Sequence, residues 1–233
     1  MEKISLIWTN WSQNEFRSGI MRKSINSLIA TTKVLLTEII AVDNGGNIED
    51  SKYLLHLTEK NAIQFYIRNS VNLYFGFARN QGVDIACGEY IGFSDNDIEY
   101  KNGWLEKSIT LLKEFPDRKI AITPLKADRQ HRNEAHWTEW FEFNGERFPA
   151  NMRAGSNSWL MRRKDFDEVG RFRNHRVAGS KWTDQFVKKG FTMITMEESP
   201  LALDMGFKKG YDIDKEVEIK RVFSNGDKII IND

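Results

Sequence analysis

The sequence contains little cysteine and has no long apolar segment. Cys87 is the single cysteine among 233 residues, which excludes a disulfide within the chain and fits a reducing compartment. The most apolar stretch, Val34 to Val42, contains Thr37 and Glu38 and is far too short to span a bilayer. The first residues lack the apolar region and cleavage site of a signal peptide. We therefore expect a cytoplasmic protein, and the sequence leaves peripheral contact with the inner face of a membrane open.

The chain also lacks an excess of charge of either sign. Its 34 basic and 33 acidic residues give a net charge of +1, which argues against a dedicated nucleic-acid binder because such proteins usually carry a strong basic excess. Hydrophobic residues make up 40% of the chain, enough for one large domain or two small lobes with a core.

No glycine follows the first predicted strand, which ends in Thr9-Asn10-Trp11-Ser12. A dinucleotide-binding oxidoreductase needs glycines at this point so that the backbone can approach a pyrophosphate, and a nucleotidyltransferase is expected to have a glycine-rich loop in the same place. The sequence therefore argues against both classes.

Strand and helix patterns alternate through the first half of the chain. Strands are predicted at 4–8, 38–42, 62–67, 90–94 and 120–123, and helices at 16–30, 48–60, 77–86 and 103–115. Strands separated by helices indicate βαβ units, so we expect an α/β fold with a mostly parallel central sheet flanked by helices.

The pattern changes near residue 125. Residues 126–155 are polar and rich in aromatic residues, and we expect them to be irregular. Strands are predicted at 158–162 and 192–196, helices at 164–169 and 183–189, and a C-terminal hairpin around Asn225-Gly226. We expect one domain over residues 1–233, with a nucleotide-binding half (1–125) and an acceptor-binding half (126–233) that contains a smaller β element.

Two aspartates, Asp95 and Asp97, follow the apolar run Tyr90 to Ser94. Residues two apart in a strand point to the same side, and open α/β sheets bind ligands at the edge where their strands end. Paired carboxylates there suit Mg²⁺ or Mn²⁺, which bind carboxylates together with substrate phosphates. The alternative is a polar loop, because loops are rich in Asp and Asn.

Three motifs, in this order, carry a resemblance to a known family. They are Val42-Asp43-Asn44-Gly45-Gly46, then Asn72 with Gly76-Phe77-Ala78-Arg79-Asn80-Gln81-Gly82, then Ala86-Cys87-Gly88-Glu89-Tyr90-Ile91 leading into Asp95-Asn96-Asp97. Together they resemble a GT-A-fold glycosyltransferase of the family 2 type. The resemblance implies a Rossmann-like sheet, Mn²⁺ or Mg²⁺ as cofactor, and inverting transfer of a sugar from a nucleotide diphosphate, expected to be UDP, to an acceptor hydroxyl in surface-glycan synthesis.

The resemblance implies donor-binding roles for residues of the first half. Thr9 and Asp43 would line the base pocket, with Asp43 accepting a hydrogen bond from the base; otherwise Asp43 is a turn residue that caps the next helix. Arg79 would reach the base or diphosphate, or else is a solvated helix residue. Gly76 would let the backbone approach the ligand closely, or else only serves a turn.

The resemblance also implies the metal site. Asp97 would touch the ion directly, while Asp95 would contact the ribose or a metal-bound water and so help to bind the donor. Asp204 stands where relatives carry a late histidine ligand; either it replaces the imidazole as a ligand or it merely ends a strand. Lys208 and Lys209 would close over the diphosphate, unless they belong to an exposed basic loop.

The acceptor side is implied less directly. Asp184, next to Thr183 where the family has an acidic pair, would be the catalytic base, with a helix-start aspartate as the alternative. Trp137, Trp140 and Trp182 would bind the acceptor, a glycan or lipid-linked glycan, unless these rings pack in the core. A helix would place Trp137 and Trp140 on one side. The alternative function is a non-catalytic nucleotide-sugar-binding module.

Overall fold

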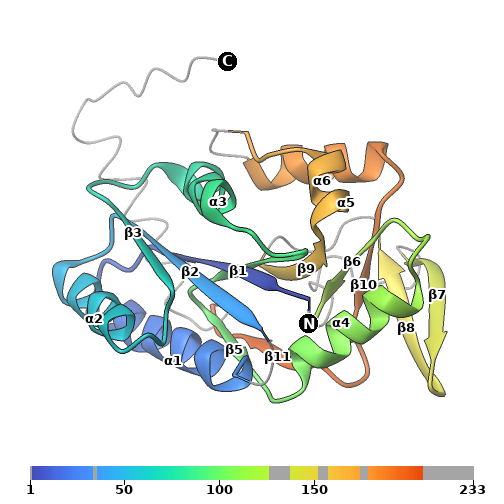
Figure 1. Ribbon diagram of the computed structural model, residues 1–233, viewed down its shortest axis with the longest axis horizontal. Coiled ribbons are helices and arrows are strands. Elements are labelled where there is room, and N and C mark those ends of the chain that lie inside the picture. The colour runs from blue at the N-terminus through green and yellow to red at the C-terminus, as the bar shows by residue number, and fades with distance from the viewer. Residues whose placement is uncertain (1, 34–35, 126–136, 152–156, 174–177, 207–233) are drawn as a thin grey trace.

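The computed structural model describes residues 2–33, 36–125, 137–151, 157–173 and 178–206 (Figure 1). Within these ranges a large sheet has nine strands in the order β3-β2-β1-β4-β9-β6-β10-β8-β7. Its strands are β1 (Ile4–Asn10), β2 (Thr37–Asn44), β3 (Phe65–Asn69), β4 (Tyr90–Asp95), β6 (Ile120–Thr123), β7 (Trp137–Phe143), β8 (Glu146–Asn151), β9 (Ser158–Arg162) and β10 (Thr192–Thr195). A second sheet pairs β5 (Ile98–Tyr100) with β11 (Ala202–Asp204).

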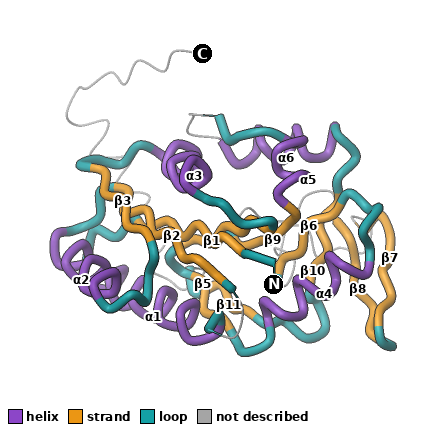
Figure 2. The backbone as a smooth tube through the Cα atoms, viewed as in Figure 1, coloured by secondary structure: helices purple, strands orange, loops and turns teal. Residues whose placement is uncertain are grey.

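Six helices in the described ranges cover the two faces of the large sheet (Figure 2). They are α1 (Glu15–Thr31), α2 (Ile48–Glu59), α3 (Tyr74–Ile85), α4 (Trp104–Glu114), α5 (Arg163–Val169) and α6 (Ala178–Lys188). None of them is long and apolar enough to cross a membrane.

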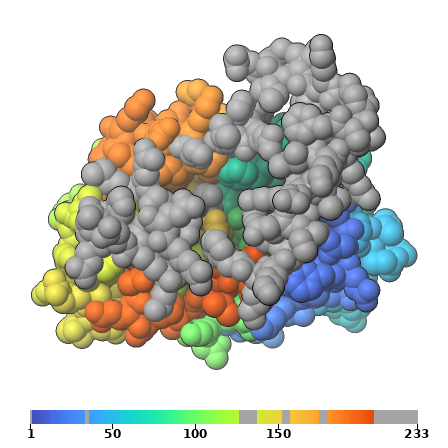
Figure 3. Space-filling model, turned by 180° about the vertical axis from the view of Figure 1, so that it is seen from behind, coloured from blue at the N-terminus to red at the C-terminus, as the bar shows by residue number. Residues whose placement is uncertain are grey.

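Apolar residues of the helices divide the core into two layers. Met21, Leu54 and Leu105 belong to one layer, which places α1, α2 and α4 on one face of the sheet. Val83 and Phe166 belong to the other, together with residues of α6, so α3, α5 and α6 cover the opposite face. Figure 1 shows this division, and the view from behind repeats it, with α5 and α6 in orange on one side and α1 in blue on the other (Figure 3).

The first half is parallel, as the sequence predicts. Strand β1 pairs in parallel with β2 and β4, and β2 with β3. The register sets Asn10 beside Asp43 and Thr9 beside Asp95. Every residue of β1 is buried, because helices cover both faces of this part of the sheet. The carboxyl ends of β1, β2 and β4 therefore meet at one edge.

The two halves of the chain interleave in the sheet. Strand β9 runs antiparallel between β4 and β6, and β10 pairs in parallel with β6. One sheet therefore contains strands from both halves of the chain. The predicted division into a nucleotide-binding half and an acceptor-binding half at residue 125 stays a prediction. The predicted C-terminal hairpin lies outside the described residues.

The expectation of irregular structure over residues 126–155 is wrong for residues 137–151. Strands β7 and β8 form an antiparallel hairpin there. Its turn is Asn144-Gly145, with φ of 50° and 76°, the left-handed conformations that this dipeptide adopts readily in hairpin turns. The sequence signal was therefore present.

Trp137 and Trp140 lie in β7 and not in a helix. Residues three apart in a regular strand point to opposite faces, but the register shifts between Trp137 and Glu139. The extra residue of this bulge returns both rings to one side, where their centroids lie 4.8 Å apart in an edge-to-face arrangement.

Candidate active site

The pair Asp95 and Asp97 stands where β4 ends and β5 begins. Asp95 Oδ1 accepts a hydrogen bond from Arg79 Nη2 at 2.7 Å, and Thr9 Oγ1 lies 3.4 Å from the same oxygen. The Asp95 side chain is 33% exposed. Thr9 and Asp95 thus meet at the carboxyl edge, as their register requires, while the base-pocket role of Thr9 stays a prediction.

Arg79 is not a solvated helix residue, so that alternative is wrong. Its side chain is fully buried, and its guanidinium lies against the rings of Phe75, Phe93 and Phe172. The charge faces Asp95. Its contact with a base or diphosphate stays a prediction.

Asp97 is buried and has little neutralising charge near it. Burial, followed by the negative charges of Asp95 and Asp204, raises the pKa of Asp97 to about 7. The guanidinium of Arg17 opposes this shift from 3.9 Å, beyond hydrogen-bonding distance. The carboxyl group therefore sits where a further positive charge would stabilise its ionised form.

Asp204 reaches this group through the small second sheet. Strand β11 ends at Asp204, which lies opposite Ile98 of β5, so its description as a strand end is confirmed. Its two oxygens accept hydrogen bonds from Asn157 Nδ2 at 2.7 Å and from the Gly206 N–H at 2.8 Å. A Cβ on Gly206 would lie 2.3 Å from Asp97 Oδ2, so a side chain there would require the Asp97 carboxylate to move. The ligand role of Asp204 stays a prediction.

The donor set suits a hard divalent ion that is shared with a substrate. Within the part of the chain that the structure describes, no group of three or more histidine, cysteine, aspartate or glutamate side chains is arranged to hold a metal by itself. Mg²⁺ and Mn²⁺ commonly bind to one or two carboxylates plus substrate phosphates. The incompletely neutralised Asp97 beside Asp95 fits that mode of binding.

Asp43 has abundant hydrogen-bond donors around it. The residue is fully buried. Its Oδ1 accepts from Asn10 Nδ2 at 3.2 Å and from the Gly46 N–H at 2.9 Å, and its Oδ2 accepts from the hydroxyls of Ser51 and Tyr66. It does not cap α2, because the N-cap is Asn47. The capping alternative is therefore wrong, and the base contact stays a prediction.

Asn10 and Asn96 are site residues that sequence reasoning missed. Asn96 Nδ2 donates to Asn10 Oδ1 at 2.8 Å, while Asn10 donates to Asp43. The amide of Asn10 thus joins the end of β2 to the residue between Asp95 and Asp97. The available signal was the position of Asn10 directly after Thr9, at the end of a predicted strand.

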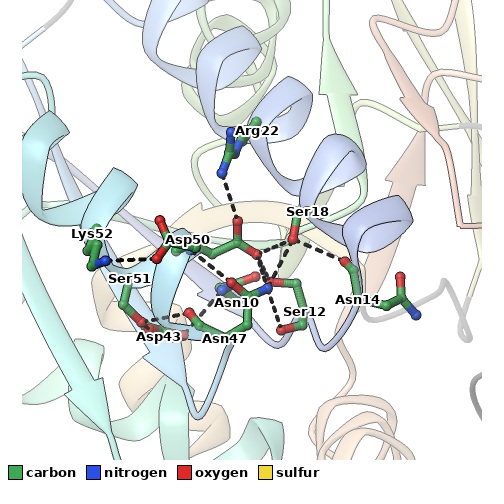
Figure 4. A network of polar contacts seen from close by, with 11 residues as sticks. Asn10, Ser12, Asn14, Ser18, Arg22, Asp43, Asn47, Asp50, Ser51 and Lys52 are labelled. Carbon is green, nitrogen blue, oxygen red and sulfur yellow. Dashed lines mark hydrogen bonds and ion pairs between the residues drawn. The ribbon is translucent and has the colours of Figure 1, made fainter.

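A second buried carboxylate holds the loop that follows β1. Asp50 Oδ2 accepts from Ser12 Oγ at 2.5 Å, Ser18 Oγ at 2.6 Å and Asn47 Nδ2 at 2.7 Å (Figure 4). The guanidinium of Arg22 lies 3.5 Å from Oδ1. These contacts tie the start of α1 to the start of α2, beside the site.

Comparison with known proteins identifies the family. The model of glycosyl transferase family 2 matches residues 12–170, more than half of the chain. The chain belongs to glycosyl transferase family 2.

Curated relatives match part of this family 2 chain. Polypeptide N-acetylgalactosaminyltransferase 9 of Homo sapiens is 32% identical over 137 residues, which cover 54% of this chain and 23% of the relative. Polypeptide N-acetylgalactosaminyltransferase 8 of Drosophila melanogaster is 27% identical over 128 residues, covering 54% and 21%. The chain therefore spans about a fifth of the length of these relatives.

Solved structures share the fold. A mannosyltransferase from Pyrobaculum calidifontis in complex with GDP-Man and Mn²⁺ superposes with a TM-score of 0.70 at 14% identity, covering 95% of this chain and 62% of that one. GalNAc-T7 with UDP, GalNAc and Mn²⁺ gives a TM-score of 0.65 at 14% identity, covering 87% and 43%. These likenesses confirm the predicted GT-A fold.

The remaining predicted residues of this family 2 chain occupy different environments. Asp184 is exposed on α6. Gly76 is buried inside α3, so it does not serve a turn, and close approach of a ligand to its backbone stays a prediction. Lys208 and Lys209 lie outside the described residues.

The three tryptophans also differ. Trp182 is 2% exposed and stacks on Trp159 with ring centroids 4.7 Å apart, so its ring packs in the core. Trp140 is 40% exposed at the sheet edge, with the guanidinium of Arg147 4.5 Å from its ring centroid. Acceptor binding by Trp137, Trp140 and Trp182 stays a prediction.

Proposed function

We propose that this chain transfers a sugar from a nucleotide diphosphate donor, with UDP as the nucleotide, to an acceptor hydroxyl in the presence of Mn²⁺ or Mg²⁺. One observation carries the proposal: buried Asp97 lies beside Asp95 at the carboxyl edge of a family 2 sheet, and burial together with the charges of Asp95 and Asp204 raises its pKa. The GalNAc-T7 structure with UDP and Mn²⁺, and the mannosyltransferase with GDP-Man and Mn²⁺, support a nucleotide diphosphate together with Mn²⁺, and the first supports UDP.

In this proposal the residues of the site divide the work. Asp97, with Asp95 and Asp204 beside it, would hold the divalent ion, which neutralises the diphosphate as it leaves. Thr9 and Asp43 would line the pocket for the nucleotide base. The acceptor would be a glycan or lipid-linked glycan, used in surface-glycan synthesis in the cytoplasm at the inner face of a membrane.

The proposed catalytic base is Asp184. An alcohol is a weak nucleophile at neutral pH, so a carboxylate must take its proton as the oxygen attacks the anomeric carbon. The bond to the diphosphate breaks as the new glycosidic bond forms, and a single displacement of this kind inverts the configuration. Asp184 is exposed on α6, and in this proposal its carboxylate would meet the acceptor hydroxyl.

Donor binding is tested by thermal shift with UDP-, GDP- and dTDP-sugars, each with and without Mn²⁺. A bound ligand raises the melting temperature by mass action, and we expect the largest rise with a UDP-sugar and Mn²⁺ together. Asp97→Ala should remove the Mn²⁺-dependent part of this rise. If no nucleotide sugar stabilises the protein, the proposal fails.

The base is tested by transfer assays. Asp184→Ala should abolish transfer and leave Mn²⁺-dependent donor binding unchanged, whereas Asp97→Ala should remove both. Asp167→Ala is a matched control, because Asp167 is also an exposed helical aspartate, and it should keep both. Full turnover by Asp184→Ala would show that another group takes the proton.

The second candidate function is a non-catalytic nucleotide-sugar-binding module. It is favoured by Thr183, which stands where the family places an acidic residue, and by Asp204, which stands in place of the late histidine. This alternative predicts Mn²⁺-dependent binding of the donor with neither transfer nor slow hydrolysis of the donor.

A further inference from the structure

Arg79 of α3 is buried in a cage of aromatic rings. It is one of the largest side chains with less than 2% exposure in the described residues. Its guanidinium carbon lies 4.9 Å from the ring centroid of Phe75, 5.5 Å from that of Phe93 and 5.3 Å from that of Phe172. Ring faces attract a guanidinium through their quadrupole, most strongly where water is excluded.

The cage holds the guanidinium in place. Its rings come from α3, from β4 and from the segment after α5, and they also pack on one another: Phe93 and Phe172 lie 5.2 Å apart, and Phe75 and Phe172 lie 6.1 Å apart. Phe172 also stacks on Trp182 at 5.2 Å. Turning Arg79 toward a ligand would open this packed cluster, which costs buried apolar contacts.

Asp95 connects the cage to the site. A buried guanidinium needs a counter-charge with good geometry, and Arg79 Nη2 lies 2.7 Å from Asp95 Oδ1. The Thr9 hydroxyl approaches the same oxygen at 3.4 Å. Arg79 and Thr9 both contact Oδ1 of Asp95, whose side chain is one-third exposed. The other carboxylate oxygen, Oδ2, is therefore the one that we expect to contact a ligand.

We propose that Arg79 is a positioning residue that acts on the nucleotide and its metal ion only through Asp95. The proposal rests on the proposed function, and it replaces the direct contact with base or diphosphate that the family resemblance implies. Arg79 holds one carboxylate oxygen of Asp95 and so orients this side chain before a ligand binds. Ligand binding then loses less conformational entropy of Asp95.

A double-mutant cycle separates direct from indirect action. The dissociation constant of UDP in saturating Mn²⁺ is measured by calorimetry for wild type, Arg79→Met, Asp95→Asn and the double variant. Methionine keeps the length and apolar packing of the side chain and removes the charge. We expect Arg79→Met to weaken UDP binding about tenfold, and the double variant to bind no more weakly than Asp95→Asn alone.

A purely structural role predicts a different pattern. In that case Arg79→Met would lower the urea midpoint of unfolding and leave the UDP affinity of the folded protein unchanged. Arg22→Met is the matched control, because Arg22 also contacts an aspartate, Asp50, and a ring, Tyr53. It should leave the UDP affinity unchanged.

Each outcome decides the question. Losses that multiply in the double variant would mean that Arg79 touches the ligand directly and would overturn the proposal, as would an unchanged affinity in Arg79→Met. If Arg79→Met does not fold, Arg79→Lys, which keeps the charge, carries the same cycle. A wild-type protein that binds no UDP with Mn²⁺ would instead refute the proposed function and the inference together.

Discussion

Two groups of aspartates lie near the carboxyl edge of one sheet, and their surroundings differ in kind. Asp43 and Asp50 are fully buried, and each accepts hydrogen bonds from several side chains. Asp97 is buried with the charges of Asp95 and Asp204 near it, which raise its pKa, while the Arg17 guanidinium at 3.9 Å lowers it. The same residue type therefore accepts several hydrogen bonds in one place and has a raised pKa in the other, because its neighbours differ.

The difference follows from what each group contacts. The Asp50 group collects hydroxyls and amides from the loop after β1 and from α1 and α2 (Figure 4). The Asp97 group is assembled by the turn from β4 into β5 and by β11, which add carboxylates. Removing a carboxylate from the Asp50 group should therefore lower the free energy of unfolding. Removing one from the Asp97 group should raise it, because electrostatic repulsion falls.

The largest expected effect on stability is that of Asp50→Ala. Ser12, Ser18 and Asn47 would lose a shared acceptor inside the protein, so we expect the free energy of unfolding to fall by about 3 kcal/mol. Urea denaturation measures it. Ser18→Ala removes one of the three donors to Asp50 Oδ2 and should cost about 1 kcal/mol. A loss below that in Asp50→Ala would show that the network does not anchor the loop.

The second prediction concerns Asp97 in the metal-free protein. Its folded-state pKa of about 7 lies above the usual 3.8, so between these values the unfolded chain has lost a proton that the folded protein retains. The stability from this carboxyl group is present at low pH and is lost as the pH rises through about 7. Asp97→Asn should therefore raise the free energy of unfolding at about pH 8 by about 2 kcal/mol.

The pH dependence provides the control for this prediction. At about pH 5 the carboxyl group is protonated in the folded protein, so the gain from Asp97→Asn should be smaller than at about pH 8. Denaturation in the presence of a chelator at both pH values measures the two gains. Equal gains, or a loss of stability at about pH 8, would contradict the described surroundings of Asp97.

A smaller effect is expected for the residue that joins the two regions. Asn10→Ala removes the buried donor to Asp43 and the partly buried acceptor of Asn96, and should lower the free energy of unfolding by about 1.5 kcal/mol. The same denaturation measurement checks it. An unchanged stability would mean that the two groups of aspartates are not linked through Asn10.

The smallest effect is expected for an exposed ion pair beside the Asp50 group. Lys52 pairs with Glu49 at 2.7 Å, and both side chains are 66% exposed. Exposed pairs contribute little because water screens them, so Lys52→Ala should change the free energy of unfolding by less than about 0.5 kcal/mol. A larger change would extend the anchoring network of Figure 4 to the protein surface.

Short-range patterns predicted much of the fold. The strands at 120–123 and 158–162 agree with β6 and β9 residue for residue, because each is an apolar run with a clear end. The hairpin β7–β8 was missed because its bulge interrupts the strand alternation. Strands β5 and β11 have three residues each and pair only with one another in the described chain, so neither had a local signal.

Part of the site was also predictable from local sequence patterns. The apolar run before Asp95 and Asp97 predicted that both follow a buried strand, and the structure has Asp95 as the last residue of β4 and Asp97 in the turn after it. The burial of Arg79 was not predictable, because its cage includes Phe172, far along the chain. The closeness of Asp204 to Asp97 depends on the pairing of β11 with β5, which no local sequence pattern predicts.

The sequence by itself determined the alternation of strands and helices and the family motifs, because the spacing of apolar residues and the chemistry of strand ends act over a few residues. Only the tertiary structure decided which carboxylates are surrounded by donors and which by other carboxylates. Burial and charge depend on side chains that the fold brings together from distant parts of the chain, and these neighbours determine whether an aspartate anchors a loop or attracts a cation.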